Sequence, residues 1–278
     1  MKVPKGARRV LTDAVTLVVI GVVYLVPFVF IFLTAAKTPA EAGLFKFTWP
    51  KQLQLLENVR EVMTFGNNRM LLALWNSTLI TVGSVTLTVL IAALAAVVLQ
   101  RRNDRLAVLV SSFMLAGLII PPAVVPTIFL LQWLGLYKRL LGMIMVNVAF
   151  NMPFAILILR AFMGTIPKEL DEATVVDGAS PLRVFFSVLL PLLQPAIVTV
   201  VITSTVAIFN DFVGPLYFLP GSKNVTAPLT LFSFVSQFGS QWNLVFADVL
   251  VVTILPLVVF IFFQKQLVSG ITSGAIKG

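Results

Sequence analysis

The sequence contains no cysteine and no histidine, and only 11% of its 278 residues are charged. Without cysteine the chain has no disulfide and no thiolate nucleophile, and without histidine it has no imidazole base. The usual transition-metal ligands are missing as well, so we expect no metal site. Soluble domains carry about 25% charged residues. The low charge therefore points away from an ordinary water-soluble domain.

Hydrophobic residues make up 59% of the sequence, and they occur in long uncharged runs. A helix needs about 20 apolar residues to cross the hydrocarbon core of a bilayer. These runs predict an all-α membrane protein with six transmembrane helices in a single domain over residues 1–278. The predicted spans are about 14–36, 73–99, 107–135, 140–160, 189–211 and 244–264, with external loops at 37–70 and 215–243.

Two uncharged runs can each be interpreted in more than one way. Basic residues precede the first run, as they do in a signal peptide, but the run Ala14–Ala36 is longer than a signal core and no Ala-x-Ala-like site closes it. We therefore expect a retained first span. The run Val225–Ala247 is rich in Ser, Thr, Gln and Gly. We interpret it as external loop with an interfacial or re-entrant part.

The basic residues predict the orientation of the spans. With a cytoplasmic N-terminus, twelve of the 20 Lys and Arg residues fall on the cytoplasmic side, as the positive-inside rule requires. Lys138 and Arg139 oppose this orientation. The net charge of +9 does not indicate nucleic-acid binding, because the basic residues lie between apolar runs and form no face interleaved with exposed aromatics. Both termini are thus expected in the cytoplasm.

Prolines interrupt several of the predicted spans. Each one removes a backbone donor and kinks or breaks its helix. In a membrane such breaks tend to face protein or a water-filled path, although simple packing kinks are the common alternative. The Pro121-Pro122 pair is the best candidate for a break that lines a path.

Residues 166–187 predict two short helices with a sharp joint between spans four and five. Pro167 suits the first helical position, and acidic residues follow it in the first turns, where the helix dipole favours negative charge. Gly178 suits a left-handed helix end, and Ser180 suits the N-cap of a second helix that begins at Pro181. By local chemistry alone, a lipid-interface anchor and a docking site for another protein are equally good interpretations.

The spacing of Glu172-Ala173, Gly178 and Leu190-Pro191 resembles the "EAA" signature of membrane subunits of ATP-binding-cassette importers. Thr174 and Val188 replace an Ala and an Ile of that pattern. Asn210-Asp211-Phe212 and the ending from Gly270 are similar to segments of carbohydrate permeases, so the resemblance covers nearly the whole chain. It is nearest to the second permease subunit of maltose-type sugar importers.

The resemblance implies a multi-pass permease of the bacterial-type plasma (inner) membrane. Its expected partners are a second permease subunit in a heterodimer, two ATPase subunits, an extracytoplasmic sugar-binding protein and the sugar itself. The chain would bind no cofactor, and ATP-Mg would lie on the ATPase subunits. The segment 166–187 would be the coupling loop, and the residues implied in ATPase coupling are Glu169, Glu172, Ala173, Thr174, Asp177, Gly178 and Pro191.

The sequence has no G-x-x-x-x-G-K-[ST] phosphate loop. We therefore expect a non-catalytic subunit, with ATP hydrolysed by another chain. Polar residues in or near the spans are candidates for a sugar path, although hydrogen bonds between helices explain them as well. These residues are Asn76, Gln132, Asn147, Asn151, Asn210 and Asp211.

Two other functions compete with ATP-driven import. An ion-coupled secondary transporter usually has more spans, inverted repeats and acids at mid-helix, and the sequence shows none of these. A membrane scaffold or sensor without transport activity is the second alternative. The identity of the sugar is not readable from any span.

Overall fold

The computed structural model describes residues 5–102, 104–176, 178–235 and 239–275, and within these ranges every regular element is a helix. The expected all-α class is confirmed. Helices suit a bilayer because all their backbone hydrogen bonds are made within one segment. The chain divides into two compact units, Met1–Leu71 with Thr230–Ile254, and Leu72–Leu229 with Leu255–Gly278. Each unit is described by itself.

The first unit contains α1 (Lys5–Ala35), α2 (Pro39–Ala42), the start of α3 (Leu55–Arg101) and the first part of α12 (Trp242–Ala275). Aromatic rings join these elements. Phe30 stacks on Phe47 and meets Phe246 edge-on, and Phe45 meets Trp242 edge-on. The end of α1 and the start of α12 therefore share one aromatic cluster.

Helix α3 is interrupted near its start. Phe65 is extended, and Gly66, Asn67 and Asn68 all have positive φ angles of about 60° (58°, 62° and 62°). Glycine and asparagine tolerate this left-handed region better than other residues. The predicted span 73–99 lies wholly in the part of α3 that follows this interruption.

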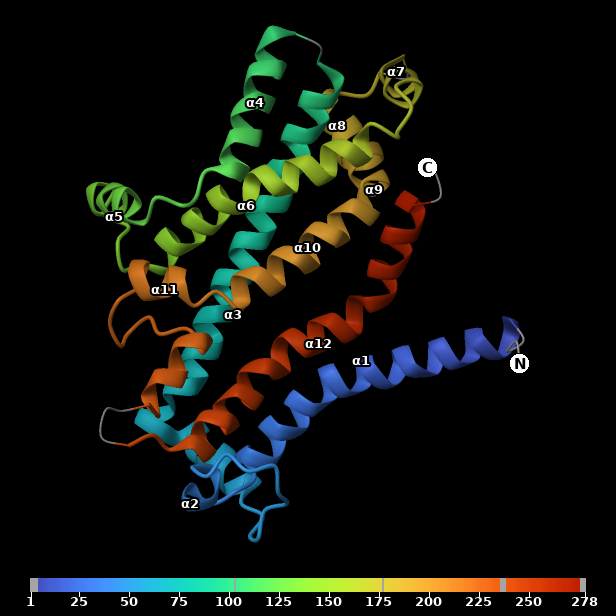
Figure 1. The fold of residues 1–278 in the computed structure, drawn as a ribbon. Coiled ribbons are helices and arrows are strands. Elements are labelled where there is room, and N and C mark those ends of the chain that lie inside the picture. Colours follow the sequence, from blue (N-terminus) through green and yellow to red (C-terminus); the bar gives the residue numbers. More distant parts are fainter. Residues whose placement is uncertain (1–4, 103, 177, 236–238, 276–278) are drawn as a thin grey trace. The chain divides into compact units, whose positions relative to one another are not determined.

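The second unit is built around α6 (Leu140–Met163), which packs against α4 (Arg105–Ile119), α10 (Gln194–Phe209) and α11 (Val213–Phe218). Figure 1 shows α5 (Val124–Trp133) and α11 near the N-terminal end of α6, and α7 to α9 beyond its C-terminal end. Its core includes a run of small residues on α3 that lets other helices approach closely. These are Ala92, Ala93 and Ala96, all completely buried.

Two of the six predicted spans are not single straight helices. The break at Pro121-Pro122 is confirmed, because α4 and α5 are bent by 117° across residues 120–123. The predicted span 189–211 is bent by 73° at Leu193. Pro195 has no N–H to donate to the carbonyl of Pro191, so the helix cannot run straight through this point.

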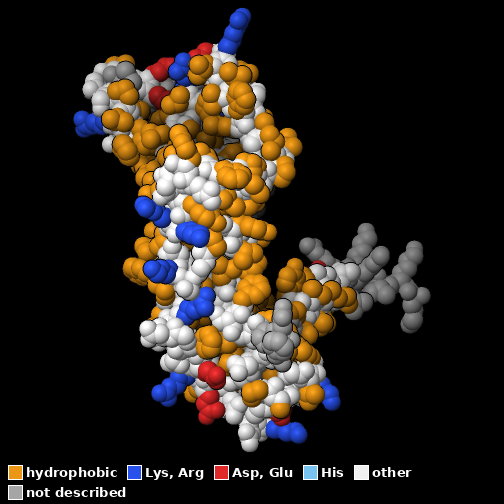
Figure 2. Space-filling model, turned by 90° about the vertical axis from the view of Figure 1, so that its left-hand side faces the viewer, with side chains coloured by type: hydrophobic (Ala, Val, Ile, Leu, Met, Phe, Trp, Pro, Cys, Tyr) orange, Lys and Arg blue, Asp and Glu red, His pale blue; other side chains and the backbone are white. Residues whose placement is uncertain are grey.

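In the part of the chain that the structure describes, four helices are long and apolar enough to cross a membrane, and the number rises to six if each bent pair is one span. The four are Thr12–Ala35, Leu55–Arg101, Leu140–Met163 and Trp242–Phe262. The run Val225–Ala247 is not among them, since its described residues include the 3-10 helix η2 (Ala227–Ser233) and only the first residues of α12. On the face drawn in Figure 2, hydrophobic side chains cover much of the surface and acidic ones are few.

Candidate coupling segment and membrane cavity

The 166–187 segment forms the predicted helix–turn–helix. Helix α7 (Glu169–Val176) is followed by a joint and by α8 (Pro181–Val184). Gly178 has a φ of +80°, and no atom lies within 4 Å of the position its Cβ would take. Glycine is therefore favoured here by the backbone conformation alone. Ser180 is the N-cap of α8 with Pro181 in its first turn, as expected, although the serine side chain makes no capping hydrogen bond.

The start of α7 differs from the prediction. The backbone N–H groups of Asp171 and Glu172 donate to the carbonyl of Lys168, at 3.0 and 3.2 Å. Pro167 therefore precedes the helix and does not occupy its first position. The expected gathering of acids in the first turn is confirmed, with Glu169, Asp171 and Glu172 there.

Helix α7 presents both charged and apolar side chains to its surroundings. Glu169 and Glu172 are exposed, and Val176 is 86% exposed. The Thr174 hydroxyl donates to the carbonyl of Leu170 at 2.7 Å, so this departure from the EAA pattern is satisfied within its own helix. Of the other predicted coupling residues, Ala173 lies in α7, Pro191 is exposed in α9 (Leu190–Leu192), and Asp177 lies outside the described residues.

Arg101, the last residue of α3, holds the start of α7. Its Nε donates to Oδ2 of Asp171 at 2.6 Å and its Nη2 to Oδ1 at 3.1 Å, which makes a two-pronged ion pair. The same guanidinium donates to the carbonyls of Ile166 at 3.3 Å and Pro167 at 3.4 Å. The positive charge also lies at the C-terminal end of α3, where the helix dipole favours it.

The neighbouring Gln100 holds the end of α6. Its Oε1 accepts from Nε of Arg160 at 3.1 Å, and Arg160 also donates to the hydroxyl of Ser111 on α4. A small apolar cluster lies under α8 and η1 (Phe185–Leu189) and joins these two elements to the end of α6. Its buried members are Met163, Ile166, Val184, Leu189 and Leu193.

Sequence reasoning missed the role of Arg101, which it treated only as one of the charges that set orientation. One signal was available, because a basic residue that ends a long span lies near the next loop on the same side of the membrane. That loop contained Asp171. The pairing of these two particular residues depends on helix packing, and the sequence pattern does not specify it.

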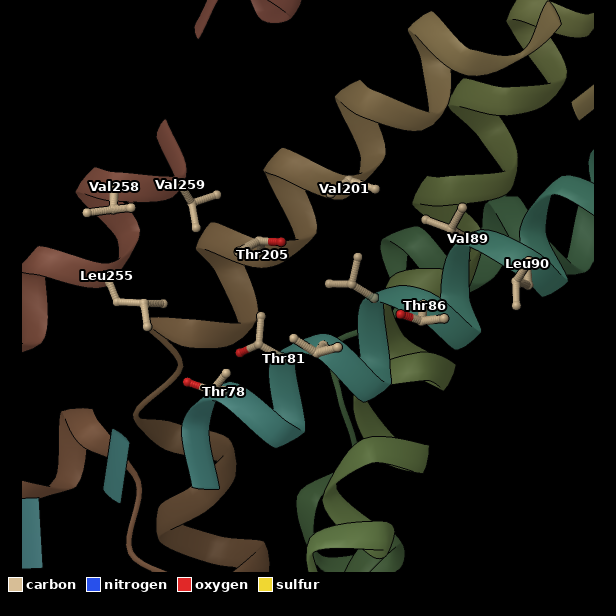
Figure 3. Close-up of a pocket in the computed structure, with 12 residues that line it drawn as sticks. Thr78, Thr81, Thr86, Val89, Leu90, Val201, Thr205, Leu255, Val258 and Val259 are labelled. Carbon is tan, nitrogen blue, oxygen red and sulfur yellow. The ribbon is translucent and has the colours of Figure 1, made fainter. Parts of the chain in front are cut away.

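A cavity of about 610 Å³ opens in the second unit between α3, α10 and α12. Eight of its twelve lining residues are Val or Leu, and the other four are threonines. Figure 3 shows Thr78, Thr81 and Thr86 on α3, with Thr205 on α10. The lining has no charged or amide side chain. It suits an apolar or amphiphilic occupant better than a sugar with many hydroxyls.

The six residues predicted for a sugar path do not line this cavity. Asn76 is buried, and its Nδ2 donates to the carbonyl of Val225 at 3.0 Å. Asn151 donates to the carbonyl of Asn147 one turn earlier in α6, at 2.8 Å.

At the end of α10, Asp211 accepts from the backbone N–H of Gly214 at 3.1 Å, whereas Gln132 and Asn210 are exposed. Hydrogen bonds within the chain thus occupy Asn76, Asn151 and Asp211. A metal centre is not indicated either, because the described part of the chain holds no group of three or more His, Cys, Asp or Glu side chains that could bind one.

Comparisons with known proteins agree with this architecture. Residues 62–272 match the family described as "Binding-protein-dependent transport system inner membrane component". The chain is 34% identical to a putative ABC transporter permease protein from Caldicellulosiruptor, over 91% of this chain and 92% of that one. It is 30% identical to the melibiose/raffinose/stachyose import permease protein MelC of Bacillus subtilis, over 99% and 100% of the two chains.

Among solved structures, a chain of a bacterial ABC transporter involved in the import of the acidic polysaccharide alginate has the same fold. The TM-score is 0.82 at 18% identity, and the match covers 95% of this chain and 99% of that one. The family match extends over most of the sequence, including the 166–187 segment and the helices that flank it. The chain therefore belongs to the family of inner membrane components of binding-protein-dependent transport systems.

Proposed function

We propose that this chain is the permease subunit of an ATP-driven, binding-protein-dependent importer of oligosaccharides. It forms the translocation path with a second, non-identical permease and hydrolyses no ATP itself. Two ATPase subunits supply the energy, and an extracytoplasmic binding protein delivers the sugar. The observation that carries the proposal is the pair of short helices α7 and α8, in which α7 exposes Glu169, Glu172 and Val176.

A mixed acidic and apolar surface on a short helix suits docking into a cleft of another protein. The apolar cluster under α8 packs the second helix of the segment against the end of α6, and the left-handed backbone at Gly178 sets the turn between α7 and α8. Movement of the ATPase subunits would then displace the 166–187 segment as a body. The attached helices would rotate between inward and outward openings, as domains do about an interface.

The substrate class is supported by MelC, whose name specifies melibiose, raffinose and stachyose. The test is uptake of these three radiolabelled sugars and of maltotriose by a strain that lacks this gene. Restored uptake of at least one sugar on re-expression is the expected result. No uptake of any of them would remove the oligosaccharide assignment. Uptake that persists without the ATPase subunits and collapses with an uncoupler would favour an ion-coupled transporter.

The coupling role is tested by Glu172→Lys in an affinity-tagged chain. Because Glu172 is exposed, reversal of its charge leaves folding unchanged and weakens capture of the ATPase subunits. Glu61→Lys is the matched control, since it makes the same charge change at an exposed helical residue of the first unit. Equal ATPase capture by both variants would contradict the docking role.

The proposed orientation places both termini and the 166–187 segment in the cytoplasm. Since the natural chain has no cysteine, a single cysteine at position 172 is the only thiol in the variant. A membrane-impermeant maleimide should label it in inverted vesicles and not in intact spheroplasts. Labelling in spheroplasts would reverse the orientation.

A further inference from the structure

We infer that Arg101 is the positioning residue through which the 166–187 segment moves α3, and with α3 the wall of the membrane cavity. The inference rests on the proposed coupling function. It identifies a residue that would transmit movement of the 166–187 segment to α3. This residue lies outside the EAA pattern, on a helix distant in sequence from the segment.

The first support is the number and direction of the contacts. Arg101 bonds both carboxylate oxygens of Asp171 inside the first turn of α7, and it bonds two carbonyls just before that turn. The side chains of Arg101 and Asp171 are only 18% and 21% exposed. Partial burial weakens screening by solvent, so this pair is stronger than an ordinary surface ion pair. The start of α7 is therefore fixed to the end of α3.

The second support is the path of α3 away from this contact. Val97 packs against the apolar cluster under α8, and Gln100 bonds Arg160 of α6. Further along, α3 supplies seven of the twelve cavity-lining residues, from Thr78 to Leu90. Thr86 and Arg101 are about 22 Å apart along the axis, at a rise of 1.5 Å per residue. The interruption at 65–68 lies beyond the cavity, so α3 has helical geometry from the cavity wall to Arg101.

The adjacent residue provides a matched control. Arg102 pairs with Asp104, two residues away, and the two side chains are 56% and 42% exposed. This pair joins the end of α3 to the N-cap of α4, and among the described residues the hydrogen bonds and ion pair of the Arg102 side chain go to Asp104 and not to the 166–187 segment. Arg102→Gln thus removes the same charge from the same helix end without releasing α7.

The experiment compares Arg101→Gln, Arg101→Lys and Arg102→Gln in the complete transporter, captured through a tag on this chain. Arg101→Gln should retain the ATPase subunits, because Glu169 and Glu172 remain exposed. Sugar uptake should fall about tenfold or more, since charged hydrogen bonds of this kind are lost. ATP hydrolysed per sugar imported should rise by a similar factor. Arg101→Lys keeps the positive charge but loses the two-pronged guanidinium, so its sugar uptake should lie between those of the wild type and Arg101→Gln. Arg102→Gln should match the wild type in both measurements.

Two results would overturn the inference. One is wild-type uptake and ATP use by Arg101→Gln. The other is loss of ATPase capture by Arg101→Gln, which would make the residue part of the docking surface or of the fold. Failure of the proposed function is separately visible, because the wild-type chain would then capture no ATPase. A double variant, Arg101→Gln with Asp171→Asn, should be no worse than Arg101→Gln alone if both act through one contact.

Discussion

Asn243 at the start of α12 donates from Nδ2 to Oδ1 of Asn58 on α3, at 2.8 Å, with both side chains buried. Asn58 in turn donates from its Nδ2 to the carbonyls of Ala35 and Lys37, at 2.8 and 3.0 Å. One side chain therefore ties together the end of α1, the first turns of α3 and the start of α12. All of these groups belong to the first unit.

Replacement of Asn58 by Ala should destabilise the first unit. The change leaves two carbonyls and one amide buried without these partners, and we expect a loss of about 2 kcal/mol or more in unfolding free energy. Thermal unfolding of the purified chain in detergent measures this loss. Gln52→Ala, at an exposed loop position, is the control and should leave Tm unchanged. A Tm for Asn58→Ala equal to that of the control would show that water satisfies these groups.

The joint at Gly178 should tolerate asparagine better than valine. No neighbour would meet a side chain there, so only the φ of +80° opposes substitution. A left-handed conformation costs an ordinary residue roughly 1–2 kcal/mol, and asparagine adopts it more readily than a β-branched residue. Sugar uptake should therefore fall in the order Gly178, Gly178→Asn, Gly178→Val. Equal uptake by the two variants would mean that the joint changes conformation during transport.

Gly142, in the first turn of α6, should be intolerant of alanine. A Cβ built there lies 2.2 Å from the carbonyl oxygen of Leu136. This is a backbone atom, so no side-chain rotation can relieve the clash. Overpacking of this kind costs about 1–3 kcal/mol. The yield and Tm of Gly142→Ala should drop. Gly21→Ala is the matched control, because nothing lies within 4 Å of its Cβ and alanine favours helix formation; a drop in both variants would point to a different cause.

The cap at the start of α4 should depend on pH. The backbone N–H of Ala107 donates to Asp104, and this bond, with the nearby Arg102 guanidinium, holds the pKa of Asp104 below its usual value of 3.8. Because the folded pKa is the lower one, the cap stabilises the helix above pH 3.8 and this contribution is lost as pH falls through the folded value.

Hydrogen exchange measures this effect. Protection of the Ala107 amide, corrected for intrinsic exchange, should decline from pH 6 to pH 3. Asp104→Asn keeps a good capping residue without an ionisable group, so protection in this variant should change little over the same interval. A parallel decline in both proteins would assign the effect to other carboxylates.

The sequence was most informative where one physical signal decides the structure. Apolar length located the helices, and the Pro121-Pro122 pair predicted a break that is present. Gly178 and Ser180 predicted the helix–turn–helix because glycine and serine have distinct backbone and capping preferences. The start of α7 was placed too early, because proline is compatible both with the first helical position and with the extended residue before a helix.

Apolar length and the backbone preferences of single residues do not predict contacts between segments that are distant in sequence. The pairing of Arg101 with Asp171 spans 70 residues and that of Asn243 with Asn58 spans 185. Such pairs depend on how helices pack, and many other pairings of polar residues satisfy the same hydropathy pattern. The bend at Leu193 was missed for a related reason. A proline can curve a membrane helix gently or break it, and neighbouring helices decide which occurs.

The π-helix at Phe185–Leu189 has a consequence for the register of the chain. It inserts a wide turn between α8 and α9, and such turns arise when one extra residue is accommodated within an α-helix. Deletion of one residue from this turn would restore α-helical geometry and leave the faces of α8 and α9 close to their present alignment, because the wide turn and the extra residue would be lost together. A chain one residue shorter here would therefore keep α8 on the same side of α9, whereas a one-residue deletion in a neighbouring α-helical turn would rotate α8 by about 100°.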